Sequence, residues 1–160
     1  MKNLVARLWR LIRGPLQWRL LWLWHAKFMV GVTGIVRDSE GRVLLLRHRM
    51  WPPDRQWGCP SGYVNKSERF EDTVVREVRE ETGLHVKVGR LLLLKSGYRL
   101  RVEAVYEAEL AGGTLTIDSV EILEAKWFSP YDLPEGVQES HRLLIQQTAT
   151  GPQGSAAAAL

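Results

Sequence analysis

The stretch that most constrains this 160-residue chain lies at residues 62–84 and reads GYVNKSERFEDTVVREVREETGL. Three apolar side chains recur in it at every fourth position: Phe70, Val74 and Val78. This period places an apolar stripe along one side of an amphipathic helix. Ser67 is a suitable N-cap residue, and Gly83 suits the left-handed position that follows a helix. We therefore expect one helix over residues 68–82.

Three glutamates lie on this predicted helix beside the apolar stripe: Glu77, Glu80 and Glu81. Their spacing of i, i+3 and i+4 projects the three carboxylates from one side of the helix. Like charges at this spacing destabilise an isolated helix by roughly 0.2–0.5 kcal/mol per pair. A divalent cation would turn that repulsion into attraction, because carboxylate oxygens are the ligands that Mg2+ and Mn2+ take. The alternative is a solvated charged face in which Arg76 and Glu80 form an ordinary ion pair.

Nine positions across the same stretch carry residue types at fixed offsets: Gly62, Glu68, Arg76, Glu77, Val78, Glu80, Glu81, Gly83 and Leu84. This pattern resembles the signature of the Nudix hydrolases at every specified position. The resemblance implies that a metal, Mg2+ or Mn2+, is bound by the three helix glutamates and the Gly62 carbonyl. It also implies that Glu68 and Arg76 pair to brace the loop against the helix. Ser61 and Ser67 stand where many members carry glycine, which bears on the subfamily rather than the chemistry.

The resemblance further implies hydrolysis of a nucleoside diphosphate linked to another moiety. Nucleoside triphosphates, ADP-ribose-like sugars and dinucleoside polyphosphates are all compatible substrates. The general base is either one of the helix glutamates or an acid outside the stretch, where Glu121 is the candidate and Glu124 and Asp118 are its rivals. The predicted catalytic set is Glu68, Arg76, Glu77, Glu80, Glu81 and Glu121.

Two functions of other classes remain as alternatives. A catalytically silent module of the same fold would bind nucleotides or regulate without turning them over, but such proteins usually lose the glutamates that are all present here. An isomerase on this fold would need a catalytic cysteine, and Cys59, directly before the signature, is a poor candidate. We expect an enzyme.

Composition points to one ordinary globular domain with appendages, since 45% of the residues are hydrophobic and 25% are charged. The single cysteine excludes an internal disulfide and favours a reducing compartment, so we expect a cytoplasmic protein. No apolar run approaches the roughly 20 residues that a membrane-spanning helix needs. The net charge of +4 is concentrated in residues 1–28, which carry six basic residues and no acid. This asymmetry argues against a broad nucleic-acid-binding surface.

Residues 1–27 mix leucine and arginine with four tryptophans: Trp9, Trp18, Trp22 and Trp24. The pair Gly14-Pro15 predicts a break between two short helices, over residues 3–13 and 16–25. These helices either pack on the domain or on a partner in a homodimer, which is our first expectation, or lie at a membrane surface as a peripheral contact.

The rest of the chain alternates strand and turn patterns. We expect strands over residues 28–36, 43–47, 85–94, 100–110, 114–117 and 125–128, and a last helix over residues 139–147. An exposed loop at residues 50–56 is a candidate for substrate contacts through Arg49, Trp51 or Arg55, and Tyr98 or Tyr106 is a candidate for stacking on a base. The expected fold is α+β, an α/β/α sandwich with a mixed sheet, over residues 28–148. Residues 1–27 form a helical extension, and residues 149–160 are expected to be a disordered tail.

Overall fold

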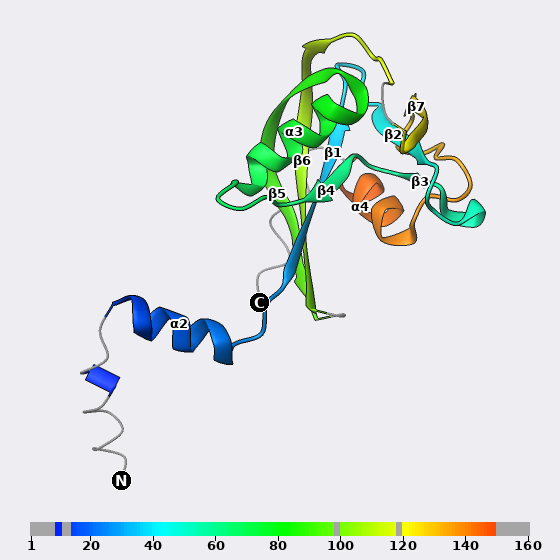
Figure 1. Cartoon of the computed structure of the whole chain (residues 1–160). Helices are drawn as coiled ribbons and strands as arrows, with labels where there is room; N and C mark the ends of the chain where they lie inside the picture. Colours follow the sequence, from blue (N-terminus) through cyan, green and yellow to red (C-terminus); the bar gives the residue numbers. More distant parts are fainter. Residues whose placement is uncertain (1–8, 11–13, 98–99, 118–119, 150–160) are drawn as a thin grey trace.

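The computed structural model describes residues 9–10, 14–97, 100–117 and 120–149 (Figure 1). A seven-stranded mixed sheet forms its centre. The strands are β1 (Met29–Arg37), β2 (Val43–His48), β3 (Trp57–Gly58), β4 (Ser61–Tyr63), β5 (Leu84–Ser96), β6 (Arg101–Gly113) and β7 (Ile122–Phe128). The main path runs β3-β2-β1-β6-β5, while β4 pairs with β1 and β7 pairs with β2. Strand β6 runs parallel to β1, and all other pairings are antiparallel.

Helices cover both faces of the sheet, which confirms the predicted α/β/α sandwich (Figure 1). Val74 and Val78 of α3 (Phe70–Thr82) belong to the core on one face, and Ile145 of α4 (Glu139–Ala149) belongs to the core on the other. Side chains of β1 and β2 alternate between these two cores, and almost all of them are buried. Because helices cover both faces of the sheet, these two strands consist of continuous apolar runs rather than of alternating apolar and polar residues.

Helix α3 begins two residues later than predicted, and Ser67 is not its cap. Ser67 adopts a left-handed backbone conformation with φ 67°, and Arg69 stands at the N-cap position without a side-chain capping bond. The carboxylate of Glu68 closes the loop instead, accepting a hydrogen bond from the Asn65 N–H at 2.8 Å. The predicted C-terminal end is confirmed, because Gly83 has φ 69° and its N–H donates to the Arg79 carbonyl at 2.9 Å.

Several sequence predictions need correction in length or type, among them the predicted strand 125–128, which as β7 begins at Ile122. Strands β5 and β6 are each 13 residues long, longer than predicted, because they pair with each other along almost their whole length. Residues 114–117 are not a strand; the Thr116 N–H donates instead to the Thr82 carbonyl at the end of α3, at 2.9 Å. The loop at residues 50–56 contains a short 3-10 helix, η1 (Pro53–Arg55). The last helix extends to Ala149, so the predicted tail beyond it, residues 150–160, lies outside the described residues.

Helix α2 (Pro15–Trp24) extends away from the domain, and none of its residues is buried (Figure 1). Trp18, Trp22 and Trp24 are 73%, 65% and 88% exposed. The expectation that this helix packs on its own domain is therefore wrong. Of the other predicted helix, only Trp9 and Arg10 are described, and both are helical. Within the described part of the chain, no helix is both long enough and apolar enough to cross a bilayer.

Candidate active site

The predicted carboxylates come together where α3 lies against β4. Strand β4 is held at this place by antiparallel pairing with β1, in which Gly62 stands opposite Val32. The side chain of Glu77 lies directly over Gly62, so that a Cβ atom on residue 62 would overlap the carboxyl group of Glu77. A glycine is required here because the helix and the strand approach so closely.

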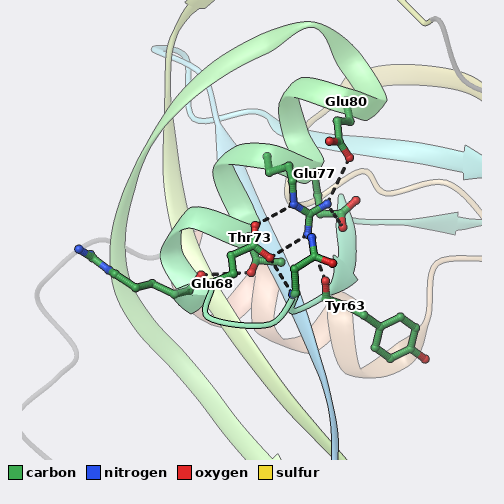
Figure 2. A network of polar contacts seen from close by, with 8 residues as sticks. Tyr63, Glu68, Thr73, Glu77 and Glu80 are labelled. Carbon is green, nitrogen blue, oxygen red and sulfur yellow. Dashed lines mark hydrogen bonds and ion pairs between the residues drawn. The ribbon is translucent and has the colours of Figure 1, made fainter.

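Arg76 makes hydrogen bonds to four of the residues labelled in Figure 2: Tyr63, Glu68, Glu77 and Glu80. Its Nε donates to Glu68 Oε1 at 2.8 Å and its Nη2 to Glu68 Oε2 at 3.1 Å, which makes a bidentate pair. Nη2 also donates to the Tyr63 carbonyl at 3.1 Å. The predicted pairing of Glu68 with Arg76 is therefore present, and it ties the loop after β4 to the helix. Hydrogen bonding from Arg76 lowers the pKa of Glu68 to about 2.

The same guanidinium group reaches two of the predicted metal ligands. Nη1 of Arg76 donates to Glu77 Oε1 at 2.7 Å and to Glu80 Oε2 at 3.2 Å (Figure 2). The ion pair with Glu80 that the sequence suggested as an ordinary surface contact is thus present as well. Burial raises the pKa of Glu77, and the contact with Arg76 opposes that rise.

Glu81 is the buried member of the carboxylate set. It is 9% exposed, and its Oε2 atom has no hydrogen-bond partner among the described residues. Burial, followed by the negative charge of Glu77, raises the pKa of Glu81 to about 8. An unpaired carboxylate oxygen in such a place is costly unless a cation or a proton compensates it.

These groups face a cleft of about 770 Å³. Its lining residues are His48, Trp51, Ser61, Gly62, Tyr63, Asn65, Arg76, Glu77, Glu80, Glu81, Arg101, Val120 and Glu121. The structure thus brings Glu121 to the same cleft as the helix glutamates, and its charge contributes to the raised pKa of Glu81. Glu124 lines no part of it and forms ion pairs with Arg47 and Lys126 on the sheet. The other rival, Asp118, lies outside the described residues.

The side chains in the cleft fit a hard divalent cation in chemistry, although they are not arranged around one. Among the described residues, no three acidic, histidine or cysteine side chains are grouped closely enough to hold a metal ion. Two of the three glutamates are instead turned to Arg76. The donors are all oxygens, which Mg2+ and Mn2+ prefer. The Oε2 atom of Glu81 has no hydrogen-bond partner among the described residues, so this oxygen is available to coordinate an ion. We conclude that the residues present fit such an ion.

Several residues that line the cleft lie outside residues 62–84, so the pattern of that stretch could not predict them. His48 stacks on Trp51 with ring centroids 3.8 Å apart, and Trp51 had been a candidate only as a loop residue. Arg101 enters from β6, and its guanidinium lies 5.4 Å from the centre of the Tyr63 ring. Arg101 reaches the cleft because β6 runs parallel to β1, and only the sheet topology reveals that neighbourhood.

Two other sequence candidates are used differently. Tyr106 is 6% exposed and belongs to the core beneath α3, so it does not stack on a base in the cleft. Arg49 does not line the cleft; its Nε donates to the Val120 carbonyl at 2.9 Å and supports the loop that carries Glu121. Tyr98 lies outside the described residues.

Comparison with known families decides what this site belongs to. A model of the NUDIX domain matches residues 27–148. The chain belongs to the Nudix hydrolase family. It is 32% identical over 126 residues to a MutT-like protein of Streptomyces ambofaciens, a match that covers 77% of this chain and 79% of that protein. The solved MutT NUDIX hydrolase of Burkholderia pseudomallei is similar with a TM-score of 0.65 and 26% identity, over 76% of this chain and 98% of that one.

Other Nudix relatives are longer than the segment they share with this chain. Nudix hydrolase 8 of Arabidopsis thaliana is 28% identical over 64% of this chain, but the match spans only 30% of that protein. An ADP-ribose pyrophosphatase of Methanocaldococcus jannaschii is 32% identical over 66% of this chain and 64% of its own length. The shared part is the Nudix domain, and residues 1–26 precede the matched family region.

Proposed function

We propose that this Nudix domain hydrolyses a nucleoside diphosphate linked to another moiety, with Mg2+ or Mn2+ as cofactor. The observation that carries the proposal is Glu81, a buried carboxylate with an unpaired oxygen that faces the cleft beside Glu77 and Gly62. Glu77, Glu80, Glu81 and the Gly62 carbonyl would hold the ion. When bound, the ion supplies positive charge against the diphosphate and makes water more acidic.

The chain's own residues have separate roles in this proposal. Glu81 and Glu121 are the two candidates to accept the proton of the attacking water, because both line the cleft and the charge of Glu121 contributes to the raised pKa of Glu81. Arg76 and Glu68 position the loop and the helix relative to each other. Phosphoryl-type transfer depends mainly on positioning and charge stabilisation, so no covalent nucleophile is needed.

Three substrate classes fit this proposal: nucleoside triphosphates, ADP-ribose-like sugars and dinucleoside polyphosphates. Among the relatives, proteins are named ADP-ribose pyrophosphatase, putative 8-oxo-dGTP diphosphatase and NAD-capped RNA hydrolase. The test is a panel of nucleotide diphosphates incubated with Mg2+ or Mn2+ and scored for phosphate-containing products. Product release by the wild-type chain and its loss in Glu81→Gln supports the proposal. Nucleotide binding without any product supports the alternative, a silent binding or regulatory module.

For the partner of α2 we propose an anionic membrane surface. Eight of the ten residues of α2 are apolar, yet none of its residues is buried, so this apolar surface lacks a covering partner among the described residues. Residues 1–28 are basic without any acid, and tryptophans favour the interface between lipid and water. A homodimer that buries the same tryptophans is the competing outcome. A cytoplasmic location and the absence of a nucleic-acid partner remain predictions from the sequence.

A further inference from the structure

A second cavity, of about 500 Å³, opens beside the carboxylate cleft. The two share Trp51, Ser61 and Arg101 as lining residues. A substrate whose diphosphate lies against the glutamates can therefore extend its other half past Trp51 and Arg101 into this cavity. The shared residues make the second cavity a direct continuation of the carboxylate cleft.

The charge of the lining changes sign between the two cavities. The first is lined by four glutamates against two arginines, Arg76 and Arg101, whereas the second is lined by three cations, Arg55, Lys95 and Arg101, against one carboxylate, Glu103. Lys95 stands opposite Glu103 across the β5–β6 pair, so this carboxylate is already surrounded by positive charge. Cations in a concave site attract an anion more strongly than they would on a flat surface.

A buried histidine, which also interacts with Glu103, lines the same cavity. His141 of α4 is 4% exposed, and neither of its ring nitrogens has a hydrogen-bond partner among the described residues. Its Nε2 lies 3.7 Å from Glu103 Oε1, which is too far for a hydrogen bond. Buried polar atoms are nearly always paired in native proteins. A ligand in the cavity would supply the missing partner.

We propose that the second cavity binds an additional anionic group, a phosphate or a carboxylate, on the half of the substrate that lies beyond the diphosphate. This inference rests on the proposed function for the position of the diphosphate. Arg55 and Lys95 provide charge that the carboxylate cleft does not share, and His141 provides a hydrogen bond. The preferred substrates are therefore diphosphates whose second half carries an extra negative charge.

The experiment uses pairs of compounds that differ by that one group. NADP+ is compared with NAD+, coenzyme A with dephospho-coenzyme A, and UDP-glucuronate with UDP-glucose. The first two pairs add a phosphate and the third adds a carboxylate, so the panel also distinguishes the two kinds of anion. We expect the charged member of at least one pair to have a kcat/KM about tenfold higher.

Lys95→Gln and Arg55→Gln should each remove much of that preference, because KM should rise more for the member with the extra anionic group than for the member without it. Lys87→Gln is the matched control, because Lys87 is exposed on the same strand as Lys95 and lines neither cavity. Equal kcat/KM within every pair would overturn the inference, and so would an equal loss for both members in Lys95→Gln.

A binding measurement separates this inference from the proposed function. Affinities of the same pairs are measured by calorimetry on Glu81→Gln, in which turnover is blocked. Selective binding of the charged member, reduced by Lys95→Gln, supports the cationic cavity even if the wild-type chain hydrolyses none of the compounds. Hydrolysis without charge selectivity supports the proposed function and refutes the cavity's role.

Discussion

Arg76 holds Glu68 by two hydrogen bonds, from Nε to Oε1 at 2.8 Å and from Nη2 to Oε2 at 3.1 Å. This pair joins the second turn of α3 to the loop that follows β4. The remaining Nη1 contacts Glu77 and Glu80, which are two of the proposed metal ligands. A cation that takes these carboxylates would compete with Nη1 but would leave the two bonds to Glu68 intact. One arginine thus supports the loop and also contacts two of the proposed ligands.

Arg76→Lys should lower kcat/KM by about tenfold or more at saturating metal, because an ammonium group cannot reproduce the bidentate contact with Glu68. Arg79→Lys is the control, since Arg79 is an exposed residue of the same helix. Steady-state kinetics with both variants gives the comparison. Wild-type activity in Arg76→Lys would show that the bidentate geometry is not needed.

Glu81→Gln should lower turnover by roughly 100-fold or more, because a neutral amide is a weaker ligand and cannot accept a proton. The fold should be retained: with a pKa of about 8, the Glu81 carboxyl is mostly neutral at pH 7 without metal, as the amide is. Circular dichroism and thermal melting check the fold. Glu68→Gln should cause a smaller loss. If Glu81→Gln keeps its kcat/KM with added Mg2+, the assignment of Glu81 as a ligand is wrong.

Gly62→Ala should reduce both activity and thermal stability, because the new methyl group would occupy the position of the Glu77 carboxyl group. Gly89→Ala is the matched control on another strand of the sheet, β5, since a Cβ there would meet the Glu107 carbonyl oxygen at an ordinary 3.4 Å. Melting curves and product assays are run on both variants. Equal behaviour of the two would contradict the close approach of Glu77 to β4.

In the metal-free protein, the contribution of His48 to stability should fall between about pH 6.5 and pH 4.5, while the raised pKa of Glu81 acts in the opposite direction over the same range, so the His48 effect is read as a difference from a His48 variant. Burial, assisted by nearby His141, lowers the pKa of His48 from 6.5 to about 4. In that window His48 binds a proton in the unfolded chain but not in the folded chain, so its contribution to the free energy of unfolding falls as the pH falls. The loss from this group is at most about 3 kcal/mol, from 1.36 kcal/mol per pKa unit. Urea unfolding at pH 7, 5.5 and 4 measures the free energy of unfolding from which this loss is obtained.

His48→Phe is the comparison for that titration, because it keeps an aromatic ring against Trp51 and removes the titrating nitrogens. The difference in unfolding free energy between the variant and the wild-type protein should therefore change across the window. A constant difference would show that His48 has a normal pKa. Glu68 loses its contribution only below pH 4.5, as its carboxylate becomes protonated, so it acts outside the window.

Deleting residues 1–26 should leave turnover per site within a few fold, because the candidate catalytic residues all follow residue 60. Binding to vesicles that contain anionic lipid should be lost, and in the full chain it should weaken with added salt. A full-length variant with Trp18, Trp22 and Trp24 changed to alanine should also lose vesicle binding, since these side chains are exposed.

Solution mass, measured by ultracentrifugation, distinguishes the outcomes of this deletion. A fall in mass without vesicle binding by the full chain would refute the membrane proposal in favour of a homodimer. Loss of catalysis in a truncated but folded chain would instead make residues 1–26 part of the active site.

The sequence by itself determined the elements whose pattern is local. Helix α3, its end at Gly83 and the side on which its glutamates lie follow from a period of 3.6 residues, which needs no information from elsewhere in the chain. The sandwich itself was predicted from the order of the strand and helix patterns along the chain and from the family resemblance. The pairing of Glu68 with Arg76 was implied by the resemblance to the Nudix signature, whose specified positions also lie close together in the sequence.

Only the tertiary structure decided which distant residues join that helix. His48, Arg101 and Glu121 lie in one cleft with Glu81 because β2, β6 and the loop before β7 meet at one edge of α3. The burial of Glu81, which changes its pKa, depends on how closely α3 approaches β4. The start of α3 was also set by a contact, between Glu68 and Asn65, rather than by the propensity of Ser67. Periodicity describes a single element, whereas burial and charge depend on how elements pack, and that packing is set by contacts far apart in the sequence.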